Sequence, residues 1–225
     1  MNLPREGEYI DIHTHDAKPA DGVFAVENLM AHEALNPENI SARAFTAGIH
    51  PWHLNENNSE HLLEYIRNIA GNPGLIAFGE AGFDKLRGPS AEIQRSVFAE
   101  QVKISGEHGK PLVIHCVRSW DELLASHKNL KPETPWLVHG FRGKKELALQ
   151  LIKRGMYLSF WFDFILRPES SDLIRFLPKE RIFLETDGAD ADIREIYRKV
   201  SQDLNIDVDE LKKNIITNFK MLFGM

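Results

Sequence analysis

The chain has only one cysteine, Cys116, among its 225 residues, so no disulfide can form within it. Absence of disulfides fits the reducing cytoplasm, where we expect the protein to reside. No apolar run is long enough to span a bilayer, and residues 1–6 lack the hydrophobic region of a signal peptide. We therefore expect no association with a membrane.

The chain also lacks an excess of positive charge, since its formal net charge is −6. This charge argues against broad, non-specific binding of nucleic acids, although it leaves room for a local basic rim. Low-complexity tracts, tandem repeats and linkers are absent from the sequence as well. The length then favours one domain spanning residues 1–225, which we expect to be a monomer without an obligate protein partner.

Eight short β-rich runs recur along the chain, and most of them are continuously apolar. Such runs are typical of a parallel sheet that is covered on both faces. The first run starts at Tyr9, and the others cover residues 23–26, 44–49, 75–78, 112–114, 136–138, 156–160 and 182–184. Amphipathic helices are expected at residues 59–70, 90–108 (with Ser90 as N-cap), 120–127, 144–154, 190–203 and 209–222. This alternation predicts a single-domain TIM (β/α)8 barrel, distorted because residues 28–43 are short and interrupted by proline.

Histidines and carboxylates follow these strands repeatedly, at the ends where the active sites of barrels are built. His13 and His15 share one face of the first strand and can hold one metal ion. The further candidates are Glu80, His115, His139 and Asp187, which follow the fourth, fifth, sixth and eighth strands. Six ligand-type residues exceed what one tetrahedral ion needs, which favours a two-metal site bridged by Glu80 or a water. With no cysteine among the ligands, an open catalytic site is expected rather than a structural zinc site.

An ordered set of segments carries a family resemblance. The segments are Asp-Ile-His-Thr-His at 11–15, Ala-Gly-Ile-His-Pro at 47–51, Gly-Glu-Ala-Gly-Phe-Asp at 79–84, Lys-Pro-Leu-Val-Ile-His-Cys at 110–116, His-Gly-Phe-Arg-Gly at 139–143 and Leu-Glu-Thr-Asp at 184–187. From Asp11 to about Phe223, the chain resembles the TatD family of metal-dependent deoxyribonucleases, within the amidohydrolase-type metallohydrolases. The resemblance implies hydrolysis of a DNA phosphodiester with the help of divalent ions.

Carried over by residue, the resemblance implies that His13, His15, Glu80 and Asp187 hold one ion, and that Glu80, His115 and His139 hold a second. Zinc, magnesium and manganese all suit such a site, so the metal identity stays open. Paired ions polarise phosphoryl oxygens and activate a bound water, from which Asp187 can accept the proton. We accordingly expect Asp187 and Glu80 to be catalytic. Substrate phosphates are expected to contact His50, His53, Lys85, Arg118 and Arg142.

Departures from the family pattern leave the substrate open. Arg142 and Gly140 stand in a segment that usually reads His-Cys-Phe-Ser-Gly, Arg118 comes one residue late, and the loop after Asp187 is short and lacks its usual proline. One alternative is therefore a metallohydrolase of a small phosphoester, ester or amide. Another alternative, from a different class, is a non-catalytic binding protein that keeps the barrel.

Some residues also have a structural interpretation. His50 and His53 either contact substrate or only fix their loop by hydrogen bonds. We interpret Cys116 as buried filler rather than a nucleophile. The aromatic run 159–164 is expected to pack in the core or at its rim, with base stacking as the alternative.

Overall fold

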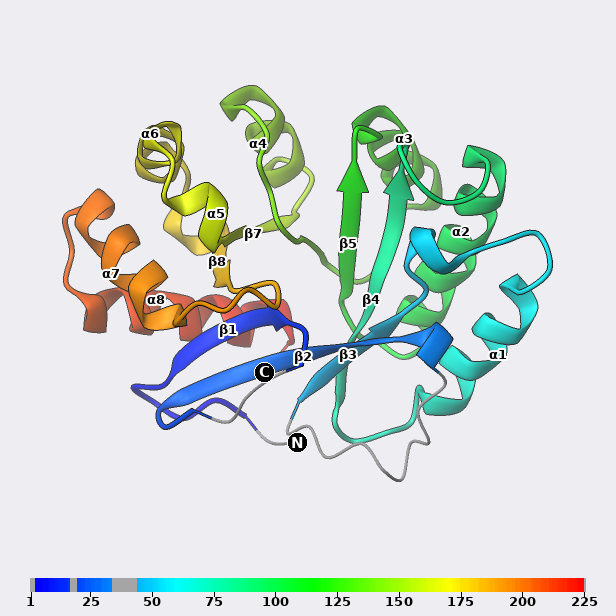
Figure 1. The fold of residues 1–225 in the computed structure, drawn as a ribbon, viewed down its shortest axis with the longest axis horizontal. Coiled ribbons are helices and arrows are strands. Elements are labelled where there is room, and N and C mark those ends of the chain that lie inside the picture. The colour runs from blue at the N-terminus through cyan, green and yellow to red at the C-terminus, as the bar shows by residue number, and fades with distance from the viewer. Residues whose placement is uncertain (1–2, 17–19, 34–43, 225) are drawn as a thin grey trace. The chain divides into compact units, whose positions relative to one another are not determined.

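The structure is a computed structural model that describes residues 3–16, 20–33 and 44–224, with helices and strands labelled as in Figure 1. All eight expected strands are present: β1 (Tyr9–Thr14), β2 (Val23–Met30), β3 (Phe45–Gly48), β4 (Leu75–Asp84), β5 (Leu112–Val117), β6 (Trp136–Val138), β7 (Tyr157–Trp161) and β8 (Ile182–Glu185). They pair in the order of the chain in one eight-stranded sheet, and each pairing whose register is defined is parallel. With helices between the strands, this order confirms the predicted (β/α)8 fold class.

The expected helices are also present, with ends that differ by a few residues. They are α1 (Ser59–Ile69), α2 (Ala91–Glu107), α3 (Trp120–Leu130), α4 (Lys145–Ile152), α7 (Ile193–Leu204) and α8 (Val208–Leu222), and the short 3-10 helices are η1 (Ala31–Glu33), η3 (Pro51–His53) and η4 (Lys179–Arg181). Ser90 caps α2 as predicted, since its hydroxyl accepts a hydrogen bond from the N–H of Ile93 at 3.4 Å. Two helices were not predicted, α5 (Phe162–Ile165) and α6 (Pro168–Phe176). A proline in the first turn starts α6, as its preset φ and missing N–H allow.

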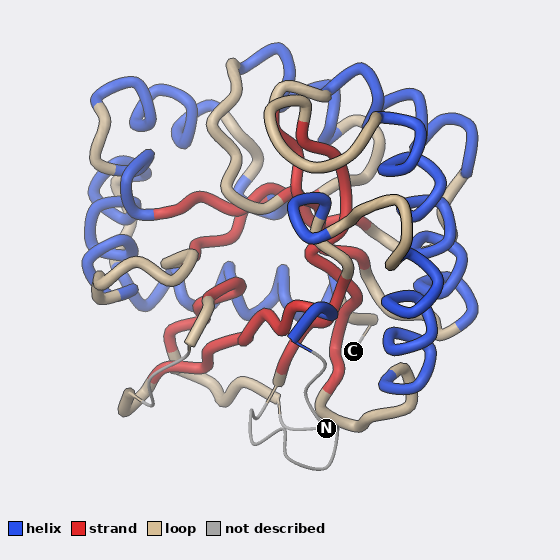
Figure 2. Tube along the Cα trace, turned by 45° about the vertical axis from the view of Figure 1, so that its right-hand side comes forward, coloured by secondary structure: helices blue, strands red, loops and turns tan. Residues whose placement is uncertain are grey.

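The chain divides into two compact units, unit 1 with residues 28–137 and unit 2 with residues 2–27 and 138–225. In unit 1, α2 packs along β4, and α1 and α3 stand beside α2, as Figures 1 and 2 show. In unit 2, β8 lies beside β1, and α7 and α8 contact both strands. The predicted irregular stretch lies partly outside the described residues, at 34–43. A single domain over residues 1–225 stays a prediction.

Buried polar side chains on helices hold the backbone near the strand ends in each unit. In unit 1, the amide of Gln101 in α2 accepts a hydrogen bond from the N–H of Ile49 at 2.7 Å and donates one to its carbonyl at 3.3 Å. In unit 2, the hydroxyl of Tyr197 in α7 makes the same pair of bonds with Ile10 in β1, both at 3.1 Å. Because buried backbone groups need partners, these bonds fix where β1 and the segment after β3 lie.

Several predicted strand ends differ from the observed ones. β2 continues to Met30 instead of ending at residue 26, and β5 continues to Val117 instead of ending at residue 114, so His115 lies inside a strand. The largest difference is at β4. The fourth strand was expected to end at Phe78, but β4 continues to Asp84, so Glu80 lies inside a strand instead of after it. The register with β5 gains one residue on β4 between Phe78 and Ala81. Such a bulge re-aims the side chains beside it, here that of Glu80. The backbone of β4 lies close to that of β5 at Gly79, where a Cβ would lie 2.2 Å from the carbonyl oxygen of Val113, so only glycine fits.

Within the described residues, no helix combines the length and the apolar composition needed to cross a membrane.

Candidate metal centre

In unit 2, the end of β1 and the second residue after β8 bring three potential metal ligands together. The Nε2 atoms of His13 and His15 lie 3.6 and 3.7 Å from the same carboxylate oxygen of Asp187. These separations exceed the 2.7–3.2 Å or so of an N–H···O hydrogen bond. They are close to the roughly 3.4 Å between two ligands of a tetrahedral ion bound at about 2.1 Å. The donor atoms of this group therefore fit one divalent cation.

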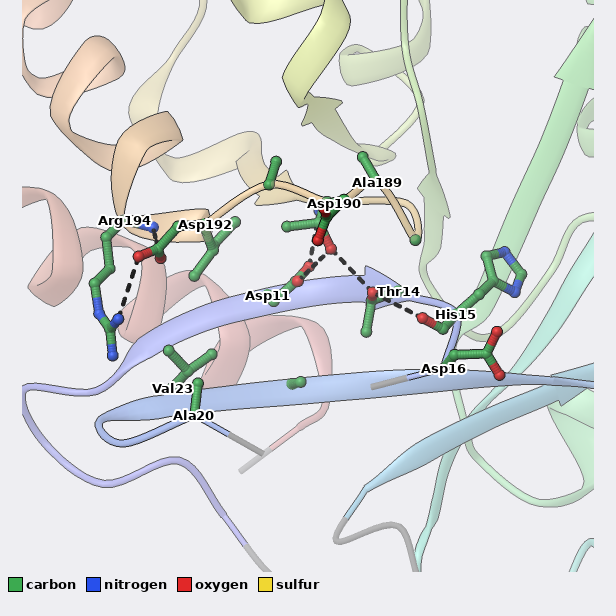
Figure 3. A pocket seen from close by; sticks show the side chains of 15 residues that line it. Asp11, Thr14, His15, Asp16, Ala20, Val23, Ala189, Asp190, Asp192 and Arg194 are labelled. Atoms are coloured by element: carbon green, nitrogen blue, oxygen red, sulfur yellow. Dashed lines mark hydrogen bonds and ion pairs between the residues drawn. The ribbon is translucent and has the colours of Figure 1, made fainter. Parts of the chain in front are cut away.

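A hydrogen-bond network sets the position of Asp187. Its N–H donates to the carbonyl of His13 at 3.1 Å, and its backbone adopts a left-handed φ of 52°. The neighbouring Thr186 donates twice to the carboxylate of Asp11, from its N–H at 3.0 Å and from its hydroxyl at 2.6 Å. Figure 3 shows this network running from Asp11 to Thr14. Burial raises the pKa of Asp11 to about 7, against the lowering effect of the Thr186 bonds.

A second carboxylate of unit 2, Glu185, lies against His139. Its Oε1 accepts the N–H of Gly140 at 2.6 Å and lies 3.7 Å from Nδ1 of His139, and its Oε2 accepts the hydroxyl of Ser159 at 2.5 Å. Burial raises the pKa of Glu185, but His139, His13 and Ser159 outweigh it and lower the pKa below its ordinary value. Sequence reasoning missed Glu185. The available signal was its position directly after the apolar run 182–184, in the Leu-Glu-Thr-Asp segment.

In unit 1, His50, Glu80 and His115 form a second group of potential ligands. One oxygen of Glu80 lies 3.6 Å from Nε2 of His50 and 3.3 Å from Nδ1 of His115. Nδ1 of His50 accepts a hydrogen bond from the N–H of Trp52 at 3.1 Å. In a neutral imidazole the other nitrogen then carries the proton, so Nε2 of His50 is a donor rather than a ligand. Glu80 and His115 are the ligands that this geometry favours in unit 1.

Two further residues of unit 1, which sequence reasoning missed as site residues, orient these ligands. Asp84 lies 3.4 Å from Nε2 of His115, which leaves Nδ1 facing Glu80. Carboxylates behind metal-binding imidazoles set the tautomer in this way. Burial raises the pKa of Asp84, but the hydrogen bonds from Trp52, Leu86 and His115 lower it on balance.

Asn28 fixes Glu80 from the other side. Its Nδ2 donates to Oε1 of Glu80 at 3.2 Å, and its Oδ1 accepts the N–H of Glu80 at 3.0 Å. The hydroxyl of Thr46 also donates to Oδ1 of Asn28, at 2.8 Å. Both the backbone and the carboxylate of Glu80 are therefore held before any ion binds.

The residues predicted to contact substrate are distributed over both units. His50 belongs to the unit 1 group, and His53 stacks on His32 with ring centroids 3.5 Å apart. Lys85 and Arg118 line one cavity of about 400 Å³ at the start of α2. In unit 2, the Arg142 guanidinium lies 4.9 Å from the centre of the Trp161 ring.

The remaining interpretations concern Cys116 and the aromatic run. Burial raises the pKa of the Cys116 thiol to about 12, which argues against a nucleophile at neutral pH. Phe160 and Phe164 are buried and stacked with centroids 6.0 Å apart, which confirms core packing for this part of the run. His32 is exposed, and its ring stacks on that of His53.

Unit 2 also contains a cavity of about 490 Å³ beside His15 (Figure 3). Its lining includes the carboxylates of Asp11, Asp16, Asp190 and Asp192, together with Thr14, Thr186 and Arg194. The guanidinium of Arg194 is paired with Asp192 at 3.2 Å. The charged side chains of the lining are therefore mostly acidic.

Comparison with known proteins identifies the family. The model of the family described as TatD related DNase matches residues 27–224. A protein of Escherichia coli K12 described as an uncharacterized metal-dependent hydrolase, YcfH, is 27% identical over 196 residues, covering 80% of this chain and 73% of that protein. The deoxyribonuclease Tat-D of Schizosaccharomyces pombe is 30% identical over 183 residues, covering 75% of this chain and 58% of the fission-yeast protein.

A solved structure shows the same fold. The crystal structure of YjjV, a TatD homologue from Escherichia coli K12, superposes with a TM-score of 0.82 over 98% of this chain and 100% of that protein, at 22% sequence identity. The family match covers most of the chain, including the ends of seven of the eight strands. The chain belongs to the TatD related DNase family and is a metal-dependent hydrolase of the class that acts on ester bonds.

Proposed function

We propose that this protein hydrolyses phosphodiester bonds in DNA with two divalent metal ions. The observation that carries the proposal is the placing of two imidazoles of His13 and His15 at ligand-to-ligand distance from one oxygen of Asp187. The donor set of nitrogen and oxygen atoms, with no sulfur, suits a hydrolytic metal site. The similarity to a protein named a deoxyribonuclease supports DNA as the substrate.

The ligands divide between the units. In unit 2, His13, His15 and Asp187 hold one ion, and in unit 1, Glu80 and His115 hold the other. That Glu80 also binds the first ion, and that His139 binds the second, stay predictions from the family resemblance. When bound, paired ions polarise the phosphoryl oxygens and lower the pKa of a coordinated water.

The residues of the chain then have separate tasks. Asp187 accepts the proton of the attacking water; its side chain is 25% exposed, so water can reach it. His50 donates a hydrogen bond from Nε2 to a substrate phosphate, because its Nδ1 already accepts one from the N–H of Trp52. Lys85, Arg118 and Arg142 are exposed cations suited to phosphate oxygens.

One observation favours a second candidate, a small phosphoester, ester or amide substrate. The cavity beside His15 has about the volume that a small-molecule site needs, and its lining carries the carboxylates of Asp16, Asp190 and Asp192. Carboxylates repel a polyanionic strand but accept hydrogen bonds from a small polar molecule. The non-catalytic alternative is disfavoured by membership in a hydrolase family.

The test is cleavage of an end-labelled single-stranded DNA oligonucleotide by metal-stripped protein, with magnesium, manganese or zinc restored in separate reactions. Asp187→Ala is compared with Asp172→Ala, which removes a carboxylate that is 90% exposed in the same unit. Metal-restored cutting that is lost in Asp187→Ala and kept in Asp172→Ala supports the proposal. If DNA is not cut although the protein binds metal, and a chromogenic small ester is hydrolysed instead, the second candidate replaces it.

The cytoplasmic location and the monomeric state stay predictions. Gel filtration at several concentrations tests the second of them, because a dimer would elute earlier as the concentration rises.

A further inference from the structure

An exposed arginine of unit 1 lies on an exposed tryptophan next to the buried ligand group. The guanidinium carbon of Arg87 is 3.8 Å from the centre of the Trp52 ring. The Trp52 ring centroid is in turn 4.8 Å from that of His50 and 5.7 Å from that of His115. Neither Arg87 nor Trp52 was a predicted site residue.

The charge of Arg87 is not neutralised by an ion pair, unlike the charges of Arg67 and Arg95 in the same unit. Arg67 is paired with Glu100 at 3.3 Å, and Arg95 with Glu122 at 3.0 Å. Among the described residues, no carboxylate lies within ion-pair distance of the Arg87 guanidinium. A cation–π contact orients the guanidinium without neutralising its charge, so its N–H groups can still bind an anion.

The Trp52 ring is itself fixed. Its Nε1 donates to Oδ2 of Asp84 at 2.5 Å, the same carboxylate oxygen that lies 3.4 Å from His115. The ring remains 41% exposed, which is unusual for a large aromatic side chain. The carboxylate of Asp84 therefore orients both His115, a predicted metal ligand, and the Trp52 ring.

The loop that carries Arg87 is held on three sides. The other oxygen of Asp84 accepts the N–H groups of Leu86 and Arg87, at 2.7 and 3.1 Å. The amide of Gln94 donates to the carbonyls of Asp84, Arg87 and Pro89, at 3.0, 3.4 and 2.9 Å respectively.

Gly88 brings the loop against η3. A Cβ on this residue would lie 2.3 Å from the carbonyl oxygen of Pro51, so only glycine permits the approach that sets Arg87 over Trp52. A residue on such a fixed loop loses little conformational freedom when it binds a ligand.

We propose that Arg87, supported by Trp52, binds a phosphate of the nucleic-acid strand next to the one that is cleaved. The inference rests on the proposed function, since it assigns a strand contact to the same hydrolase. A planar guanidinium that stays charged can bind two phosphate oxygens at once, and the single charge of a phosphodiester suits it. Trp52 acts as a positioning residue, and Arg87 is the residue that touches the substrate.

The experiment measures KM and kcat for an oligonucleotide and for a small chromogenic phosphodiester with one phosphate, at several salt concentrations. Arg87→Ala is expected to raise KM for the oligonucleotide about tenfold, which is the change expected when one charge-assisted hydrogen bond is lost. KM for the small diester is expected to change much less, because that substrate has no neighbouring phosphate. The salt dependence of oligonucleotide binding should weaken by about 0.7 in log–log slope, the value for one contact to a single strand.

Three further variants distinguish the effect of the Arg87 charge from effects on the structure. Arg87→Lys keeps the charge and should keep the salt slope. Trp52→Leu should raise KM for the oligonucleotide. In the Trp52→Leu background, arginine and lysine at position 87 should also give more similar values of this KM, because the planar stack that favours arginine is lost. Arg67→Ala, which removes an exposed arginine with a carboxylate partner, should behave like the unchanged protein.

An unchanged oligonucleotide KM and salt slope in folded Arg87→Ala would overturn the inference while leaving phosphodiester cleavage intact. If the unchanged protein cleaves no phosphodiester with any metal, the proposed function fails instead. Fluorescence anisotropy with a labelled oligothymidylate then tests the inference alone. Weaker binding by Arg87→Ala than by Arg67→Ala supports it, and equal binding refutes it.

Discussion

The potential ligand groups of the two units differ in their exposure to solvent. In unit 2, the side chains of His15 and Asp187 are 31% and 25% exposed, although that of His13 is fully buried. In unit 1, those of Glu80 and His115 are 3% and 10% exposed. In the unit 2 group, His15 lines a cavity, whereas Glu80 and His115 of the unit 1 group are buried.

The means of fixing the ligands differ in the same way. In unit 1, side chains of Asn28 and Asp84 hold Glu80 and His115. In unit 2, Asp187 is placed through the backbone, by its own N–H and by that of Thr186. A buried ligand needs partners for every polar atom, while an exposed one can exchange water and reach a substrate. We infer that the unit 1 group is organised to retain an ion and the unit 2 group to carry out the chemistry.

The largest expected effect is the loss of turnover when a ligand of either group is removed. Asp187→Ala and His115→Ala should each lower metal-dependent kcat by about a thousandfold or more, because each removes part of the catalytic metal site. Each variant should keep the ion of the other group, which elemental analysis would show as one ion per chain. Full activity in folded Asp187→Ala, with Asp172→Ala beside it as the control, would refute the site assignment.

A smaller effect is expected from Asn28→Ala, which removes the side chain that holds Glu80. Partners of this kind typically change metal affinity by about 10–100-fold. Titration of metal-stripped protein should therefore show one weakened site and one unchanged site. If the metal affinity of both sites falls equally, Asn28 does not act on the unit 1 group alone. The two ligand groups would then differ less in how they are held than the hydrogen bonds indicate.

Thr186→Val tests the backbone-based arrangement of unit 2. The variant keeps the shape of the side chain but removes the hydroxyl that donates to buried Asp11. Loss of one partner of a buried carboxylate should cost about 1–3 kcal/mol in the free energy of unfolding. Urea denaturation measures this cost, and Thr217→Val, on the exposed face of α8, provides the control. Equal midpoints for the two variants would contradict the role of Thr186.

The smallest effect concerns the pKa of His53 in unit 1. Burial and the nearby His32 lower this pKa below the ordinary histidine value of about 6.5, with a smaller contribution from Arg87 and an opposing one from Glu33. The folded state therefore binds this proton more weakly than the unfolded state, so protonation of His53 reduces stability as the pH falls below about 6.5. An NMR titration of metal-stripped protein should show a higher pKa in His32→Gln. An unchanged pKa would mean that burial alone causes the shift.

The sequence was sufficient to predict which residue types stand at the strand ends. The continuous apolar runs predicted all eight strands, because a parallel sheet covered on both faces needs them. The spacing of His13 and His15 predicted their shared face, since side chains in a strand alternate with a period of two. The single cysteine and the histidine-rich segments likewise pointed to oxygen and nitrogen ligands.

Other properties depended on tertiary structure. The buried residue Glu80 lies at a bulge in β4, and the strand pairing that creates this bulge is not encoded in local periodicity. The tautomer of His50 depends on the N–H of Trp52, and that of His115 on Asp84, a residue 31 positions away. Arg87 could not be distinguished from other exposed arginines until the loop, Gly88 and Trp52 were seen together. Local sequence determines element type through short-range sterics and apolar spacing, whereas protonation and the availability of charge depend on neighbours that only the folded chain brings together.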